Sequence, residues 1–140
     1  MLTIFNQSDH QSTLEQLDPL LLENGEVKVL PAAVLAKISK SDLLYWCFMR
    51  GVYCLPTLEL VEWLKMRIQG KSAIEIGAGH GALGKALGIP ATDSKMQDQP
   101  EIKRYYQAIG QTTVRYPSHI KELDADSAIQ KYAPQVVIEA

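Results

Sequence analysis

The stretch 72–84, with the sequence SAIEIGAGHGALG, limits the possible folds of this chain more than any other. A short apolar run that contains one acidic residue, Glu75, is followed by glycines at alternate positions, Gly77, Gly79 and Gly81. Glycine adopts positive φ angles without steric cost and allows a neighbour to approach closely. The stretch therefore predicts a strand, a tight glycine turn and a short helix directly after it.

Helices and strands alternate along the chain after residue 57. The expected helices lie over 57–69, 82–87, 100–110 and 126–133, and the expected strands over 72–76, 89–93, 120–125 and 135–140. The third strand has an alternative position at 112–116, and we favour 120–125. Such alternation is typical of a parallel sheet with right-handed crossovers. The predicted fold class is therefore α/β, with a parallel sheet of about four strands in 58–140.

The first 57 residues predict a mainly helical segment. We expect a short helix, a turn at Asn24 and Gly25, a strand over 27–30 and a helix over 32–38. The predicted domain organisation is an N-terminal segment over 1–57 and a ligand-binding domain over 58–140.

An apolar run at 43–50 predicts a buried helix within the N-terminal segment. Ser41 and Asp42 are residue types that commonly cap the start of a helix, and Gly51 ends it. The large aromatic residues are expected in the core: Trp46, Phe48 and Trp63.

Composition excludes several classes of function. The net charge is −2, from 14 basic and 16 acidic residues, so nucleic-acid binding is not indicated. No run of about 18 apolar residues could cross a membrane, and the first residues lack the basic start of a signal peptide. Cys47 and Cys54 do not have metal-ligand spacing, so we expect no metal site. We expect both to be reduced core residues of a cytoplasmic protein.

Ligands of parallel sheets bind at the carboxyl ends of the strands, where the glycine turn lies. The stretch from Gly79 to Gly84 satisfies G-x-G-x-x-G, the pattern of dinucleotide-binding proteins, so a nucleotide-dependent oxidoreductase is one interpretation. Asp93 follows Gly79 by 14 residues, whereas the dinucleotide pattern places its acid about 20 residues on. The charge of Glu75 also opposes a bound pyrophosphate.

The segment 73–84, AIEIGAGHGALG, resembles motif I of the class I S-adenosylmethionine-dependent methyltransferases, an acidic residue followed by G-x-G-x-G. The resemblance implies a Rossmann-like fold, S-adenosylmethionine as cofactor and methyl transfer as the activity. It extends over 58–140. The family's sheet has seven strands and this chain supplies about four, so the resemblance implies the N-terminal, cofactor-binding part of such an enzyme.

The resemblance assigns cofactor contacts to the first strand and its turn. Gly77, Ala78, Gly79 and Gly81 are expected to pass under the methionine and ribose parts of the cofactor. Glu75 is expected to act near the cofactor's amino group. The alternative for Glu75 is a carboxylate satisfied by backbone N–H groups alone, because a buried charge needs some partner.

The second strand is expected to supply the contact to the ribose. By the resemblance, Asp93 accepts hydrogen bonds from both ribose hydroxyls, which suits a carboxylate because its two oxygens accept two donors. The alternative for Asp93 is a helix cap. Ser94 and Met96 then lie where the family lines its adenine pocket.

Later and earlier segments supply further candidates. Asp124 and Ala125 resemble the family's Asp-Ala pair, whose carboxylate accepts from the adenine amino group; Asp126 is an alternative in the same turn and equally a helix cap. Tyr53 and Thr57 are expected to donate to the cofactor's carboxylate, with a buried tyrosine and a helix cap as the alternatives.

The acceptor of the methyl group and the catalytic base are not specified by the sequence. Glu139 is the one positional candidate for a catalytic role, and His80 is assigned no chemistry. The apolar strand at 136–138 is expected at a sheet edge, which favours a homo-oligomer through this strand. The non-enzymatic alternative is a cofactor-binding or interaction domain.

Overall fold

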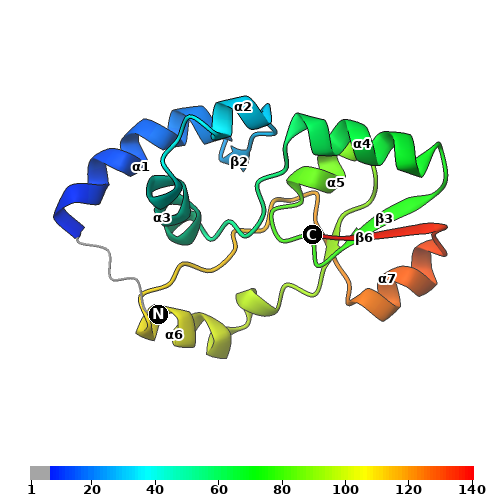
Figure 1. The fold of residues 1–140 in the computed structure, drawn as a ribbon. Coiled ribbons are helices and arrows are strands. Elements are labelled where there is room, and N and C mark those ends of the chain that lie inside the picture. Colours follow the sequence, from blue (N-terminus) through cyan, green and yellow to red (C-terminus); the bar gives the residue numbers. More distant parts are fainter. Residues whose placement is uncertain (1–6) are drawn as a thin grey trace.

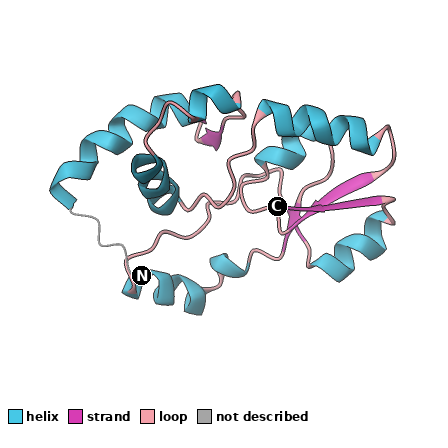
Figure 2. Cartoon of the chain, viewed as in Figure 1, coloured by secondary structure: helices cyan, strands magenta, loops and turns pink. Residues whose placement is uncertain are grey.

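Helices make up about half of the chain that the computed structural model describes, residues 7–140 (Figure 1). The elements in chain order are α1 (Gln7–Leu21), β1 (Leu22–Glu23), β2 (Glu26–Val27), α2 (Ala32–Leu35), α3 (Lys40–Arg50), α4 (Leu58–Ile68), β3 (Ala73–Ile76), α5 (Ala82–Leu87), β4 (Thr92–Asp93), the 3-10 helix η1 (Met96–Asp98), α6 (Pro100–Ala108), β5 (Lys121–Glu122), α7 (Ala125–Tyr132) and β6 (Val136–Glu139). The fold is mixed α/β, and the described strands close no barrel (Figure 2).

The N-terminal segment builds an apolar core of its own. Leu17 and Leu21 of α1 belong to one buried cluster with Val27 of the hairpin and Trp46 of α3. The β1–β2 hairpin turns at Asn24 and Gly25, which have φ angles of 52° and 78°. The predicted turn is therefore confirmed, because these two residue types tolerate the positive φ angles of a two-residue hairpin turn.

A polar contact locks α1 to α3. The indole N–H of Trp46, which has no exposed surface, donates to Oδ1 of Asp18 at 2.8 Å. Arg50 donates to both carboxylate oxygens of Asp18, at 2.9 and 2.6 Å. The Arg50 guanidinium and the indole lower the pKa of Asp18 more than its partial burial raises it. Asp18 thus satisfies a buried donor and pairs with a cation at once.

Two parallel strand pairs make up the C-terminal part. β3 pairs with β6, with Glu75 opposite Ile138, and β4 pairs with β5, with Asp93 opposite Glu122. A single parallel bridge, Glu75 to Ala91, lies between the pairs. The described strands therefore form two small ladders joined at one position.

Side-chain and backbone bonds strengthen this junction. Thr92 has no exposed surface, and its hydroxyl donates to the Glu75 carbonyl at 2.9 Å. The backbone N–H of Glu75 donates to Pro90 and that of Ala78 to Thr92, both at 2.9 Å. The glycine turn after β3 is thereby anchored to β4.

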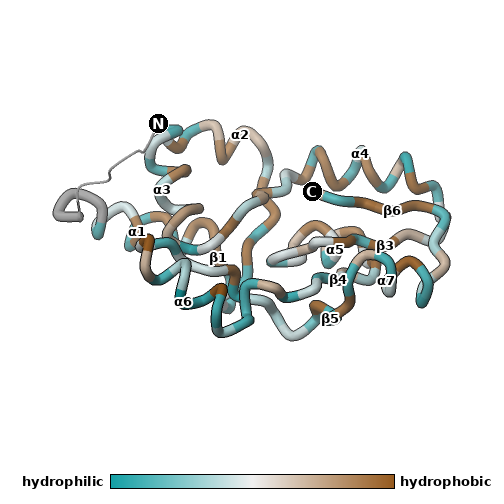
Figure 3. Tube along the Cα trace, turned by 90° about the horizontal axis from the view of Figure 1, so that it is seen from below, coloured by the Kyte–Doolittle hydropathy of each residue, from teal (hydrophilic) through white to brown (hydrophobic). Residues whose placement is uncertain are grey.

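Two helices, α4 and α7, lie on opposite sides of the β3–β6 strand pair. In Figure 1, α4 runs above these strands and α7 below them, and α7 packs against β3 and β4. β6 is mainly apolar (Figure 3), and Val137 is 43% exposed. Association of β6 with another copy stays a prediction.

Most of the expected elements are confirmed, with shorter strands than expected. The helix over 82–87 has the expected bounds, and those expected over 57–69, 100–110 and 126–133 correspond to α4, α6 and α7. The third strand lies within the favoured range, at Lys121–Glu122, whereas 112–116 is loop. The strand expected over 27–30 is reduced to β2 and one bridge between Leu30 and Thr57.

The expected cap of α3 is wrong. The helix begins at Lys40, and its cap is Ser39, whose hydroxyl accepts from the Asp42 N–H at 3.2 Å. The helix is also buried on one face rather than all round, since Leu44 is 56% exposed.

One of the three expected core aromatic residues lies on the surface. Trp46 is fully buried and Phe48 half-buried, but Trp63 is 48% exposed on α4. The Arg67 guanidinium lies 5.0 Å from the centre of the Trp63 ring, a favourable cation–π contact. Trp63 is two positions from Val61, about 200° around the helix, so it lies on the face opposite the buried Val61 and Ile68. Within the described residues, no helix has the length and apolar character needed to cross a membrane.

The Asp18 contact gives a test of the N-terminal core. Asp18→Ala should lower the free energy of unfolding by about 1–3 kcal/mol, because it leaves the buried Trp46 N–H without a partner. Asp98, whose ion pair with Lys103 is about half exposed, provides the control. Asp98→Ala should cost less than about 1 kcal/mol. Urea unfolding of both variants measures the difference, and equal losses would contradict the role given to Asp18.

Candidate functional site

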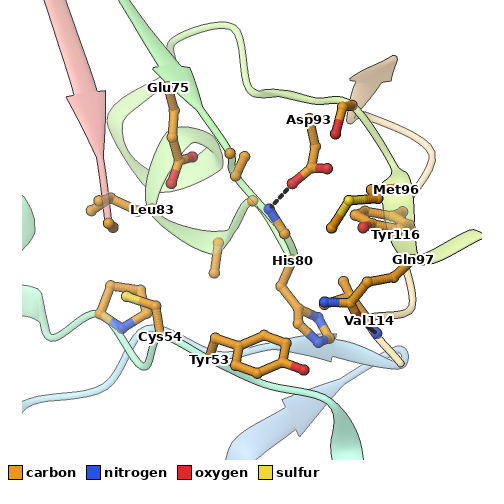
Figure 4. A pocket seen from close by; sticks show the side chains of 18 residues that line it. Tyr53, Cys54, Glu75, His80, Leu83, Asp93, Met96, Gln97, Val114 and Tyr116 are labelled. Atoms are coloured by element: carbon orange, nitrogen blue, oxygen red, sulfur yellow. Dashed lines mark hydrogen bonds between the residues drawn. The ribbon is translucent and has the colours of Figure 1, made fainter. Parts of the chain in front are cut away.

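A cavity of about 320 Å³ opens at the carboxyl ends of β3 and β4. Its walls come from the glycine turn, the start of α5, the segment after β4, the loop before β5 and the segment 53–56 between α3 and α4. In the view of Figure 4, Glu75 and Asp93 lie across the cavity from Tyr53. A volume of this size lies at the lower end of the range of small-molecule sites, about 300–1,000 Å³.

The glycines of the turn have two different roles. Gly77 and Gly79 have φ angles of 58° and 53°, and a Cβ added at either would meet nothing within 4 Å. Their missing side chains leave open space beside the cavity. Gly81, with φ of 64°, is different, because a Cβ there would collide with Ile120 and His119. The positive φ angles predicted for all three are confirmed.

Glu75 is the acidic residue of the first strand and is buried. Its side chain points from β3 towards α5, where Oε2 accepts from the Gly84 N–H at 2.8 Å. A Cβ at Gly84 would lie 2.5 Å from that same oxygen and 3.0 Å from the Cβ of Ala91, so a larger residue there would displace the carboxylate. Among the described residues, no hydrogen bond to Oε1 is found, and Glu75 lines the cavity. One backbone N–H thus satisfies only part of this carboxylate.

Burial dominates the protonation of Glu75. It raises the pKa to about 7 from an ordinary value of 4.5, against the opposing effect of the Gly84 N–H, and the charge of Asp93 raises it further. Within the part of the chain that the structure describes, no cation contributes to this shift. Glu75 therefore lacks a counter-charge, and a cation in the cavity would favour its ionised form.

Asp93 ties the glycine turn to the end of β4. Its Oδ2 accepts from the Gly79 N–H at 2.9 Å and its Oδ1 from the Lys95 N–H at 2.7 Å (Figure 4). The contact to Lys95, two residues on, is a local turn and caps no helix. Each carboxylate oxygen keeps acceptor capacity, and Asp93 lines the cavity.

Among the described residues, the lining carries acidic groups and no lysine or arginine. Glu75 and Asp93 are its carboxylates. His80 also lines it, and burial lowers the pKa of this histidine despite the opposing effect of the nearby Gly51 and Arg50 carbonyl groups. Neither ring nitrogen of His80 has a hydrogen-bond partner or appreciable exposure within the described part of the chain. The cavity therefore suits a cationic ligand better than an anionic one.

The loop before β5 supplies lining residues that sequence analysis missed. Val114 is 4% exposed, and its N–H donates to Oε1 of Gln97 at 2.8 Å. Tyr116 lies nearby, where burial first and the Asp93 charge second raise its pKa to about 12. Val114, Gln97 and Tyr116 all line the cavity. This loop has no periodic pattern, so nothing in the sequence places it over the glycine turn.

The structure brings most of the predicted cofactor contacts together. The predicted residues in the lining are Glu75, Gly77, Ala78, Gly79, Gly81, Asp93, Ser94, Met96 and Tyr53. Tyr53 is 60% exposed, so the alternative of a buried tyrosine is wrong.

Four other candidates lie outside the lining. Thr57 caps α4 by accepting from the Leu60 N–H at 3.2 Å. Asp124 caps α7 by accepting from the Ser127 N–H at 2.7 Å, so the helix cap is Asp124 and not Asp126.

Ala125 is the first residue of α7 and is exposed. Glu139 is the last residue of β6, also exposed, and its strand neighbour is Ile76. Neither lines the cavity, although Ala140, the residue after Glu139, does. Among the described residues, no group of three or more His, Cys, Asp or Glu side chains is arranged to hold a metal ion.

Comparison with known proteins gives no relative: no protein-family model, curated protein or solved structure matches this chain. The candidate site therefore has to be interpreted from its own residues.

The raised pKa of Glu75 predicts how stability depends on pH. Below about pH 4.5 the carboxyl is protonated in both the folded and the unfolded chain, so it has no effect. Between about pH 4.5 and 7 the unfolded chain ionises while the folded chain keeps its proton, so the free energy of unfolding falls as pH rises. Glu75→Gln should remove this fall.

Urea unfolding at pH 5 and pH 8 tests this prediction. The variant should gain stability relative to the wild type as pH rises, because an amide oxygen still accepts from Gly84 and carries no charge. Glu122→Gln, at an exposed position of β5, is the control and should leave the pH dependence unchanged. If the free energies of unfolding of wild type and Glu75→Gln differ by the same amount at both pH values, the raised pKa of Glu75 is contradicted.

Proposed function

We propose that the cavity binds S-adenosylmethionine and that the chain serves methyl transfer. The observation that carries this proposal is the acidic lining, with a buried, partly satisfied Glu75 beside open glycine backbone. S-adenosylmethionine carries an ammonium and a sulfonium, so it supplies the positive charge that Glu75 lacks. When bound, it supplies an activated methyl group.

The arrangement of strands supports a Rossmann-like sheet. Through the Glu75–Ala91 bridge, the neighbours run in the order β6, β3, β4, β5, all parallel. The chain moves outward from β3 to β5 and then returns to the other side of β3 for β6. Ligands of open α/β sheets bind where the strand order reverses in this way. The glycine turn at the end of β3 lies at that point.

The residues fit separate parts of the cofactor. The methionine and ribose parts of the cofactor lie in the open space at Gly77 and Gly79. Glu75 faces the positive groups, and Asp93 accepts from the ribose hydroxyls with the acceptor capacity that Gly79 and Lys95 leave. Ala78 continues the surface of the glycine turn, and Ser94 and Met96 line the part of the cavity that the resemblance gives to the adenine.

The dinucleotide alternative has less support. A pyrophosphate would lie in a cavity with two carboxylates and no lysine or arginine in its lining. Bringing such an anion there carries a Coulombic cost that the glycine N–H groups have to offset, and Gly79 N–H is already bonded to Asp93.

Ligand titration calorimetry tests the choice between cofactors. S-adenosylhomocysteine and S-adenosylmethionine should give saturable binding, and NAD should give none. Glu75→Gln should lower the affinity for S-adenosylmethionine by about tenfold or more relative to the affinity for S-adenosylhomocysteine, because only S-adenosylmethionine carries the sulfonium. Saturable binding of NAD without binding of either adenosyl compound would remove the methyltransferase proposal.

The role of Asp93 is tested with two ligands. Asp93→Asn should weaken S-adenosylhomocysteine by about tenfold or more, because it replaces an acceptor for the ribose hydroxyls by a donor. For an analogue that lacks both ribose hydroxyls, the same substitution should lower the affinity by less than about threefold.

This comparison separates ribose binding from damage to the turn. Loosening of the Gly79 and Lys95 contacts would weaken both ligands equally, and an equal loss would therefore remove Asp93 from ribose recognition. Asp98→Asn, in the exposed η1, is the matched control and should change neither affinity.

A further inference from the structure

A second cavity, of about 430 Å³, lies on α3 and the segment that follows it. Leu43, Leu44, Cys47 and Phe48 line it from one face of α3, as their spacing of four residues requires. This cavity is larger than the candidate cofactor cavity, and its described lining comes from the N-terminal segment except for Gln111.

The surface of this second cavity is apolar and open. Leu44 is 56% exposed and Tyr53 is 60% exposed, and both line it. Contact with an apolar partner would remove this surface from water, which is favourable. The concave shape favours a small molecule that enters it over a flat protein surface.

Tyr53 joins the two cavities. Its side chain lines both of them, and the next two residues divide between them: Cys54 lines the cofactor cavity and Leu55 the second cavity. The Gln111 amide donates to the Tyr53 hydroxyl at 3.2 Å and also lines the second cavity. Figure 4 shows Tyr53 and Cys54 on the edge of the cofactor cavity opposite Glu75.

Charges in the second cavity limit its occupant. Lys40, in the first turn of α3, is the one charged side chain among the described residues of the lining. A polyanion such as a nucleic acid needs several cations, and this lining offers one. A highly polar molecule would leave its groups unpaired against the leucine and phenylalanine side chains.

We propose that the second cavity binds a small, mainly apolar molecule, and that this is the class from which the methyl acceptor comes. The second part rests on the proposed function, because it takes the neighbouring cavity as the cofactor site. Tyr53 and Gln111 place one polar group of the bound molecule at the boundary between the two cavities. The remainder of the molecule lies along the apolar face of α3.

Nuclear magnetic resonance of the isotopically labelled chain tests this inference, with 2-naphthol and indole as probes. At least one probe should give saturable shifts of the backbone amide signals of Leu43, Leu44 and Tyr53 in the absence of any cofactor. Leu44→Glu should weaken that binding by about tenfold or more, because it places an unpaired carboxylate in the cavity.

Two further variants keep the test specific. Leu44→Trp adds no charge but fills the space, so it should weaken binding as well. Met66→Glu, at a 65% exposed position of α4 outside the lining, should leave binding unchanged. Circular dichroism checks that each variant folds, which the exposure of both positions favours.

The two proposals fail separately. If S-adenosylhomocysteine does not bind while a probe shifts the α3 signals, the cofactor assignment fails and the second cavity stands. If S-adenosylhomocysteine binds but neither probe gives saturable shifts, or the shifts map to Gly77 and Gly79 instead, the second cavity fails. A second copy of this chain is the remaining candidate occupant, and light scattering tests it. If the wild type is a dimer and Leu44→Glu converts it to a monomer, the cavity is an interface between copies and the inference is overturned.

Discussion

Glu75 is the residue on which the C-terminal part of the fold depends. Its backbone pairs with Ile138 of β6 on one side and bridges to Ala91 on the other. Its carbonyl accepts from the buried Thr92 hydroxyl, and its carboxylate accepts from the N–H of Gly84 in α5. One position therefore connects both strand pairs and the helix after the glycine turn. The cost of this position is a buried carboxylate whose pKa is raised to about 7.

The glycines around Glu75 follow from that arrangement. Gly84 lets α5 approach close enough for the N–H to reach the carboxylate, and Gly81 lets the chain at His119 and Ile120 pack against the turn. Gly77 and Gly79 have no such neighbour. Their positive φ angles hold the turn open beside the acidic cavity, so the same short stretch provides both packing and space for a ligand.

The N-terminal segment contributes a wall to the cavity as well as a core of its own. Asp18 and Trp46 fix α1 against α3, and Gly51 at the end of α3 lies close against the Thr113 carbonyl of the distant loop. The segment after α3 then runs between the two cavities through Tyr53. The Asp18 contact and the close approach of Gly51 to Thr113 thus position the segment that borders both cavities.

Local patterns in the sequence predicted the α/β class, the order of the elements after residue 57 and the glycine turn with its acidic neighbours Glu75 and Asp93. These depend on periodicity and on glycine backbone freedom, which act over a few residues. The caps at Ser39 and Asp124 could not be assigned this way, because adjacent residues of capping type compete for each role. Trp63 was expected in the core from its residue type alone, and its place on α4 opposite Val61 exposes it. Tertiary structure alone decided that Val114 and Tyr116 close the first cavity and that Tyr53 borders both, because these positions follow from long-range packing that leaves no local pattern.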